Sequence, residues 1–443
     1  MSLQAHLPLN NHYFSYMKKI LFSLLVIIPL MTFGKHQIKV PNVKSLQASV
    51  NGDWTKLPVM ELGSRDVLTV SFDELSHNYH RFIVHVEHCE FDWTTSDGLF
   101  ESDWLQGFND WQIDDYENSL NTNVLYTNYR FQIPNDMCRL KLSGNYIIHI
   151  LDEDSDNEEV ACVELRVVEP IASVSMGVSA NTDIDMNRSH QQVSMGVRLN
   201  GLSVINHKEQ LKTIVMQNGY EDDMRSEVMP NIITANEMRW EHRRDYIFNG
   251  GNEYHRFEVL DPTHITLGLE KVFWDDDECR FHVYPDKCEP QRNYLFYRDA
   301  NGAFLVRNSD NVENDRISDY VYVHYKFAPI KNYTDATVFI DGRWTNEDAS
   351  TYIMTYDDSD HSYNATILQK LGYYNYRIMI SSRNEPTSLL PEEDTNSTSV
   401  SRLPEEGNFY ETENSYQAFV YYKETAGRTW RLVGYKEVSF QAN

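Results

Sequence analysis

The chain has 443 residues, of which 66 are acidic and 39 are Lys or Arg, and a formal net charge of −27 at pH 7. An acidic surface repels phosphate groups, so this composition excludes proteins that bind nucleic acid or anionic lipid by charge. The five cysteines are odd in number and form no disulfide framework; only Cys279 and Cys288 are near enough in the sequence to close a small loop.

The N-terminal segment has the order of a secretory signal. Two lysines precede an apolar run over 20–33, and the small residues Thr32 and Gly34 precede a cleavage position at Lys35. The run is too short for a membrane-spanning helix, and no later segment reaches the length that such a helix needs. We expect residues 1–34 to be an upstream extension plus a signal peptide, with the true start at Met17, and the remaining chain to be exported in soluble form.

Short strands dominate the rest of the sequence. Segments rich in β-branched and aromatic residues alternate with turns such as Asn51-Gly52, Asn218-Gly219 and Asp341-Gly342. The twelve predicted strands are 67–72, 81–87, 145–150, 160–168, 193–199, 210–217, 254–260, 320–327, 337–340, 373–380, 417–422 and 431–435. This pattern predicts an all-β protein built of sandwiches.

Two breaks in the pattern divide the exported chain. A strand ends at Glu169-Pro170, and a polar run lies between Arg307 and Ser318. We predict three consecutive β-sandwich (immunoglobulin-like) domains after the signal peptide, which are residues 35–169, 170–312 and 313–443. A long polar loop over 381–407, which carries three prolines, is expected to interrupt the last domain.

Candidate metal-binding groups are sparse. In HVEHC, His85 and Cys89 would share one face of a strand about 13 Å apart and His88 would point to the other face, so one metal ion could not take two of them. The stretch DEDSDNEE begins like a calcium loop at Asp152, with Asp154 and Asp156 at the right spacing, but its turn glycine and its closing glutamate are replaced. We expect a solvated hairpin tip there.

The sequence also lacks the motifs of serine hydrolases, zinc proteases and P-loop enzymes. No nucleophile, base or metal cluster can be named from the residues alone. We therefore predict a protein that is not an enzyme and that needs no cofactor and no metal.

Several segments resemble a known family. In chain order they are Asp92-Trp93, Ser96-Asp97, Gly107-Phe108, IDDYENSLNTNVLYTNY at 113–129, SGNY at 143–146, NTDIDMNRSHQQV at 181–193, FNGGNEYHRFEVLD at 248–261 and EGNFYETENSYQAFVYY at 406–422. They resemble the plug protein of the type IX secretion system of Bacteroidota. The chain departs from the family pattern at Thr95, where the family often has proline, and at Asn128, where it often has histidine.

The resemblance implies a periplasmic protein associated with the periplasmic face of the outer membrane. Such a protein would bind the giant outer-membrane β-barrel subunit of the translocon reversibly and close it when no cargo is present. Steric occlusion requires no small-molecule substrate, no nucleic acid and no insertion into the membrane. A wide barrel encloses water, so folded mass is what would block it.

An acidic segment rich in rings supplies the candidate contact residues. Trp104, Phe108, Trp111 and Tyr116 lie in GLFESDWLQGFNDWQIDDY, which has neither a strand period nor a helix period. Such rings form either the core of the loop itself or a surface for a partner. The sequence leaves both interpretations open.

A second class of function comes from the C-terminal part. Residues 338–380 are similar to the sugar-binding β-sandwich modules of glycogen and starch enzymes, with Trp344 at the position of a stacking ring. This likeness implies an outer-membrane glycan-binding protein as the alternative. The second ring and the Lys or Asn that would complete a sugar platform are not identifiable, which favours a sandwich used as a spacer.

Overall fold

The computed structural model describes residues 36–383 and 398–442. The predicted signal segment and most of the predicted polar loop lie outside the described residues. Strands make up 49% and helices 6% of the protein, so the predicted all-β class is confirmed. The number of immunoglobulin-like domains stays a prediction.

Residues 37–168, which we name the first module, form two sheets and a short ribbon, with antiparallel pairing throughout except for the parallel pair β3 and β12. One sheet has the order β1-β12-β11-β5-β7, with β3 beside β12; the other has the order β2-β4-β9-β8; the ribbon is β6-β10. Alternate residues of β4, namely Leu68, Val70 and Phe72, are buried in the core, as the period of a strand requires. The bounds are β1 Gln37–Ile38, β2 Val43–Val50, β3 Val59–Glu61, β4 Leu68–Glu74, β5 Phe82–Cys89, α2 Glu101–Trp104, β6 Leu105–Gly107, β7 Trp111–Gln112, β8 Asp115–Asn118, β9 Thr127–Ile133, β10 Cys138–Leu140, β11 Gly144–Asp152 and β12 Glu158–Val168.

The second module, defined as residues 173–249 and 414–440, also has two sheets. One has the order β13-β14-β18-β17, with β19 beside β14, and the other has the order β16-β15-β30-β31. The bounds are β13 Ser173–Ser179, β14 His190–Arg198, α3 His207–Gln210, β15 Leu211–Gln217, β16 Tyr220–Ser226, β17 Ile232–Ile233, β18 Glu237–Trp240, β19 Ile247–Asn249, β30 Asn414–Tyr422 and β31 Arg431–Phe440.

The third module, residues 255–402, is built around the long strand β28. This strand pairs with β20, β23, β25 and β29, and the second sheet has the order β21-β22-β24-β27-β26. The bounds are β20 His255–Val259, β21 Leu269–Asp275, β22 Arg280–Pro285, β23 Phe304–Val306, α4 Asn314–Ile317, β24 Tyr320–Phe327, β25 Ala336–Asp341, β26 Thr355–Asp357, β27 Ser362–Lys370, β28 Gly372–Arg383 and β29 Thr398–Arg402. Each module has its own hydrophobic core cluster.

Each of the twelve predicted strands overlaps an observed strand. Strand pairing extends into both ends of the predicted polar loop, because β28 and β29 form a hairpin in which Arg383 pairs with Thr398. Residues 384–397 of that loop lie outside the described residues.

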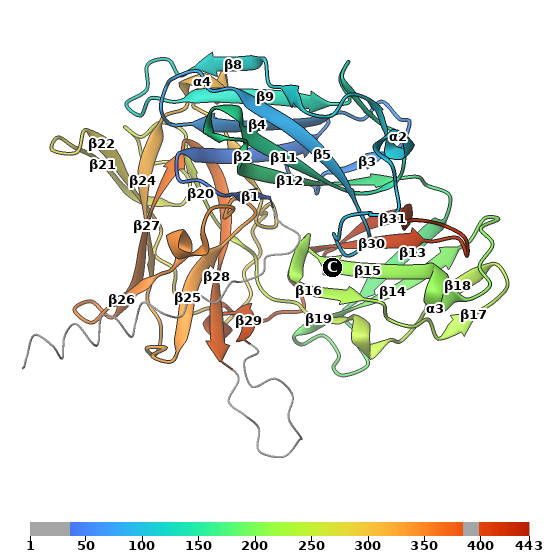
Figure 1. Ribbon diagram of the computed structural model, residues 1–443. Coiled ribbons are helices and arrows are strands. Elements are labelled where there is room, and N and C mark those ends of the chain that lie inside the picture. The colour runs from blue at the N-terminus through green and yellow to red at the C-terminus, as the bar shows by residue number, and fades with distance from the viewer. Residues whose placement is uncertain (1–35, 384–397, 443) are drawn as a thin grey trace, which may run out of the picture. The chain divides into compact units, whose positions relative to one another are not determined.

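The pairing of the last two strands crosses the predicted boundary between residues 312 and 313. Figure 1 shows the red strand β30 beside the green strand β15, and the register joins Leu211 to Tyr422 and Gln217 to Tyr416. Conversely, β20 and β23 pair with β28 although they precede the boundary. We therefore propose that the second module is discontinuous and that the third module is inserted between its two parts.

All five cysteines are free. Cys279 is exposed in the turn between β21 and β22, whereas Cys288 is buried, so the small loop that a disulfide between them would close does not form. No helix in the described part of the chain is long and apolar enough to cross a membrane.

Buried ion pairs join the modules to one another. Lys370 Nζ of the third module lies 2.6 Å from Asp73 Oδ2 of the first, and both side chains are almost fully buried. Arg166 of the first module pairs with Glu221 of the second at 2.9 Å. Separating the modules would leave a charge without its partner at each of these positions, and an unpaired buried charge is strongly destabilising.

Candidate partner-binding surface

The connection from β5 to β11 carries an unusual share of exposed apolar side chains. Of the 22 exposed large hydrophobic residues in the described chain, six lie between residues 100 and 137. They are Phe100, Phe108, Tyr116, Leu120, Leu125 and Met137. Exposed apolar side chains that gather in one segment are typical of contact surfaces.

Gly107 determines how Phe108 is presented. Its φ is +120°, and a Cβ there would lie 1.9 Å from the carbonyl oxygen of Met137. Only glycine lets β6 approach β10 this closely, and the Phe108 amide then donates to Met137 O at 2.7 Å. The Phe108 ring is left 70% exposed.

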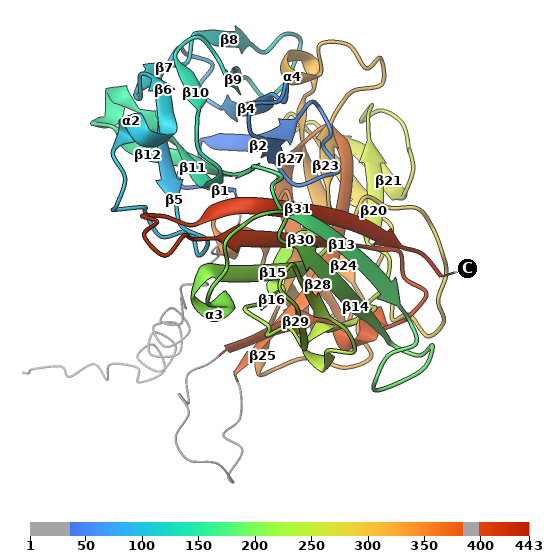
Figure 2. The ribbon, with the colours of Figure 1, turned by 90° about the vertical axis from the view of Figure 1, so that its right-hand side faces the viewer.

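Phe100, Phe108 and Met137 flank three elements of the first module. Phe100 precedes α2, Phe108 follows β6 and Met137 precedes β10, and these elements lie together at one side of Figure 2. Phe100 is 75% exposed and Met137 is also exposed. We name these three residues the α2–β10 surface.

The structure divides the four predicted contact residues into two pairs. Trp104 and Trp111 are buried in the first core, where they contact Tyr146 and Phe131 respectively. Phe108 and Tyr116 are exposed, and Tyr116 packs against the exposed Tyr79 with ring centroids 4.7 Å apart. Trp104 and Trp111 therefore belong to the core, and Phe108 and Tyr116 stay candidates for contact with a partner.

Sequence reasoning missed Phe100, Met137 and Tyr79. Phe100 lies in the same segment as the predicted rings. Its position directly before the acidic residues Glu101 and Asp103 of α2 could have indicated that it is exposed. Met137 and Tyr79 join the exposed residues only through pairing between distant strands, which a local pattern does not reveal.

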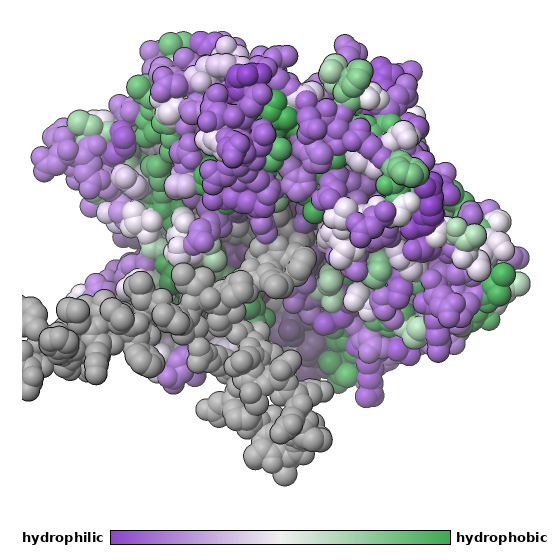
Figure 3. All heavy atoms as spheres, in the orientation of Figure 1, coloured by the Kyte–Doolittle hydropathy of each residue, from purple (hydrophilic) through white to green (hydrophobic). Residues whose placement is uncertain are grey.

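The surroundings of these rings are polar and acidic. All four residues of β8 are exposed, and three of the neighbouring side chains are Asp114, Asp115 and Glu117. Figure 3 shows one face of the protein as mainly hydrophilic, with apolar residues in small separate groups. Such a surface favours contacts that form and dissociate, rather than a large interface from which water is excluded.

The HVEHC stretch forms ordinary strand contacts. His85 Nδ1 lies 2.6 Å from Asp110 Oδ1, and the buried His88 lies 2.8 Å from Ser96 Oγ. Burial lowers the pKa of His88 and raises the pKa of Cys89 to about 12, so both groups stay neutral at physiological pH.

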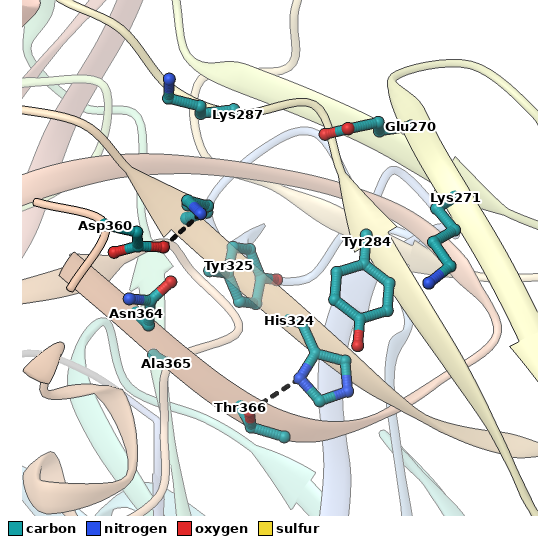
Figure 4. Close-up of a pocket in the computed structure, with 11 residues that line it drawn as sticks. Glu270, Lys271, Tyr284, Lys287, His324, Tyr325, Asp360, Asn364, Ala365 and Thr366 are labelled. Atoms are coloured by element: carbon teal, nitrogen blue, oxygen red, sulfur yellow. Dashed lines mark hydrogen bonds and ion pairs between the residues drawn. The ribbon is translucent and has the colours of Figure 1, made fainter. Parts of the chain in front are cut away.

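A polar groove of about 380 Å³ lies in the third module between the β21–β22 hairpin and strands β24 and β27 (Figure 4). Lys326 pairs with Asp360, and His324 Nδ1 lies 2.9 Å from Thr366 Oγ1. Burial, reinforced by the neighbouring His282, lowers the pKa of His324 to about 4, so this imidazole is neutral.

The ring of Trp344 is only 6% exposed. It packs against Tyr325 with centroids 6.1 Å apart, and its indole nitrogen donates to Asn375 O at 2.8 Å. A sugar platform needs an open ring face, which this position does not offer. Trp344 is part of the core of the third module.

Three of the family-like segments meet in a buried junction. Gln191, from 181–193, donates to the carbonyls of Tyr410 and Thr412 at 2.8 and 2.9 Å. Asn414 donates to Gly250 O at 2.8 Å, and a Cβ on Gly250 would lie 2.0 Å from the carbonyl oxygen of Phe409. These segments fix how the chain crosses between the second and third modules.

Comparison with known proteins agrees with this geometry. A family model described as the type 9 secretion system plug protein first domain matches residues 43–169, which span nearly the whole first module. The crystal structure of a hypothetical protein from Parabacteroides merdae ATCC 43184 is 31% identical, covers 92% of this chain and 99% of its own, and has a TM-score of 0.84. No curated protein matches the chain. The chain therefore belongs to the type IX secretion system plug protein family.

Proposed function

We propose that this protein is a non-enzymatic plug that closes the periplasmic side of the large outer-membrane β-barrel of the type IX translocon by reversible binding. Membership of the family gives it a role in type IX secretion. The observation that carries the proposal is the family match over residues 43–169, because the matched module also bears the α2–β10 surface.

A plug must stay folded while it occupies the barrel opening, and the ion pairs between the modules are consistent with this requirement. Lys370 and Asp73 are 1% and 0% exposed, so solvent does not screen their attraction. Arg166 is also stacked over the ring of Phe419 of the second module, with the guanidinium carbon 4.8 Å from the ring centroid. Modules held in this way resist being pulled apart at an opening.

The mechanism is binding exchange without a covalent step. The α2–β10 surface supplies rings that are already held in place by α2, β6 and β10, so little conformational entropy is lost on contact. Its acidic surroundings limit the dry area, which makes release possible. The protein is expected in the periplasm at the inner face of the outer membrane.

Pull-down of the tagged mature protein from solubilised outer membranes tests the proposal. We expect recovery of a giant barrel subunit with wild-type protein and at least tenfold less recovery with Phe100→Asp/Phe108→Asp, since hot-spot rings carry most of an interface energy. Ile205→Asp is the matched control, because Ile205 is equally exposed in the second module. Equal recovery with all three proteins would remove the α2–β10 surface from the interface.

Permeability tests the occlusion itself. Deletion of the gene should make cells sensitive to large antibiotics, and wild-type protein should restore the barrier. A deletion strain that stays impermeable while the empty barrel accumulates contradicts the proposal, whatever the outcome of the pull-down.

A further inference from the structure

His80, Asp152 and Asp154 come together at the surface of the first module. His80 lies in the loop before β5, Asp152 ends β11, and Asp154 lies in the turn that leads to β12. One ligand atom from each of the three side chains lies within 4.8 Å of the other two. Imidazole nitrogen together with carboxylate oxygen is a ligand set that divalent transition metals accept.

The hydrogen bonds of His80 fix its tautomer. Ser76 Oγ donates its only proton to Glu74 Oε2 at 2.5 Å, so in its 3.1 Å contact with His80 Nε2 it must accept. In a neutral imidazole the proton is therefore on Nε2. The lone pair of Nδ1 then faces Asp152 Oδ2 at 3.9 Å, which is too long for a hydrogen bond.

Two acceptors that face each other across 3.9 Å can be bridged by a cation. We propose that His80 Nδ1, Asp152 and Asp154 bind one divalent transition-metal ion, with Zn²⁺ as the best match. Zn²⁺ accepts imidazole nitrogen and carboxylate oxygen at about 2.0–2.2 Å, which places neighbouring ligand atoms roughly 3.5 Å apart. The 3.9 Å separation of His80 Nδ1 and Asp152 Oδ2 has to close by a few tenths of an ångström, and the exposed Asp154 side chain has to close separations that lie within 4.8 Å.

The carboxylates are held in place without losing their ligand capacity. Asp152 Oδ2, the oxygen that faces His80, accepts from Ser155 Oγ at 3.0 Å, and Asp154 Oδ2 accepts from the Arg81 amide at 3.2 Å. Each oxygen keeps a second lone pair for a metal. Asp154 is exposed, so a water molecule can fill the remaining coordination position.

The relay from Glu74 through Ser76 to His80 is the outer shell that metal-binding histidines usually have. Ca²⁺ and Mg²⁺ prefer oxygen ligands alone, so the histidine excludes them as the best occupants. The bound ion would tether the loop before β5 to the β11–β12 hairpin. This site is independent of the proposed plug function.

Metal binding by the full mature protein tests the site. After treatment with a chelator, calorimetry with ZnCl₂ should give one equivalent of bound metal, and CaCl₂ at the same concentration should give none. Co²⁺ should produce the visible absorption of a tetrahedral site. His80→Gln and Asp154→Asn should each weaken binding at least tenfold, and Ser76→Ala should weaken it by about 10–100-fold.

Asp156→Asn is the matched control, because Asp156 lies exposed in the same turn but outside the cluster. This control should bind Zn²⁺ like the wild type. The proposal is overturned if the wild type binds no Zn²⁺, in which case a protonated His80 alone would bridge the carboxylates. It is equally overturned if His80→Gln binds as tightly as the wild type, or if Asp156→Asn weakens binding as much as Asp154→Asn.

Discussion

Glu221 and Asp222 are neighbours in β16, and their carboxylates pair with arginines of two different modules. Glu221 Oε1 lies 2.9 Å from Arg166 Nη2 of the first module, and Asp222 Oδ2 lies 2.8 Å from Arg377 Nη2 of the third. Successive side chains of a strand point to opposite faces. One strand of the second module therefore holds the other two modules, one on each face.

Loss of the Glu221 charge should destabilise the protein strongly. Glu221→Gln leaves the buried guanidinium of Arg166 without its counter-ion, and removing one partner of a buried pair costs about 3–5 kcal/mol. Urea unfolding measures the free energy. Glu241→Gln is the control: its pair with Arg239 is partly exposed, so less than about 1 kcal/mol should be lost. Similar losses for both variants would show that β16 does not hold the modules.

Asp73 and Lys370 should show strong coupling in a double-mutant cycle. Burial raises the pKa of Asp73 and lowers the pKa of Lys370, and the mutual attraction opposes both shifts. Lys370→Met leaves a buried carboxylate and should cost about 3–5 kcal/mol. Asp73→Asn/Lys370→Met should be more stable than Lys370→Met alone, because no charge is left buried. A double variant as unstable as the sum of the two single losses contradicts the coupling.

Glu253 should make stability depend on pH. Burial raises the pKa of Glu253 to about 7, and its Oε2 atom is buried without a hydrogen-bond partner in the described chain. A carboxyl whose folded pKa is raised stabilises the fold fully below its unfolded pKa, near 4.3, and this stabilisation is lost as pH rises through about 7. Thermal unfolding at pH 5 and pH 8 should therefore show lower stability at pH 8, by roughly 3 kcal/mol at most.

Glu253→Gln should reduce this difference between pH 5 and pH 8, and Glu209→Gln, at an exposed position, should leave it unchanged. Asp299 accounts for part of the remaining dependence, because burial raises its pKa to about 6. An unchanged difference in Glu253→Gln would show that Glu253 ionises normally in the folded protein.

Gly107→Ala should disturb the α2–β10 surface more than a substitution at an open turn. Gly52 also has a positive φ, but a Cβ there would meet nothing within 4 Å. Gly52→Ala should therefore show only the conformational cost, about 1 kcal/mol. Gly107→Ala adds a clash with Met137 O, so we expect a larger fall in the unfolding midpoint and weaker partner binding. Equal effects would mean that β6 and β10 separate freely.

Strand positions follow from the sequence because they depend on local residues. The apolar and aromatic residues that predict the strand 67–72 include Leu68, Val70 and Phe72, which the observed strand buries. The partners of a strand depend on residues far away. Nothing near 211–217 indicates that β15 pairs with β30, and so the interleaving of the second and third modules could not be predicted.

The candidate surface shows the same limit. Trp104 and Phe108 occupy one acidic segment, yet one ring fills the core and the other is exposed. Which ring is buried and which is exposed depends on the pairing of β6 with β10. That pairing is possible because Gly107 has no side chain. The sequence indicated two members of the metal-binding cluster, Asp152 and Asp154, through their calcium-like spacing. It did not indicate His80, which is brought to them by the pairing of β5 with β11.

The insertion of the third module into the second also constrains the order in which the protein matures. A chain that is synthesised or exported N-terminus first can complete the first module early. It can complete the third module once residue 402 has appeared. The second must wait for β30 and β31, so β15 is paired only with β16 until the final residues appear. Sequence separation of this kind slows folding, and a chain cut short before Asn414 would carry an exposed, unmatched edge that invites aggregation.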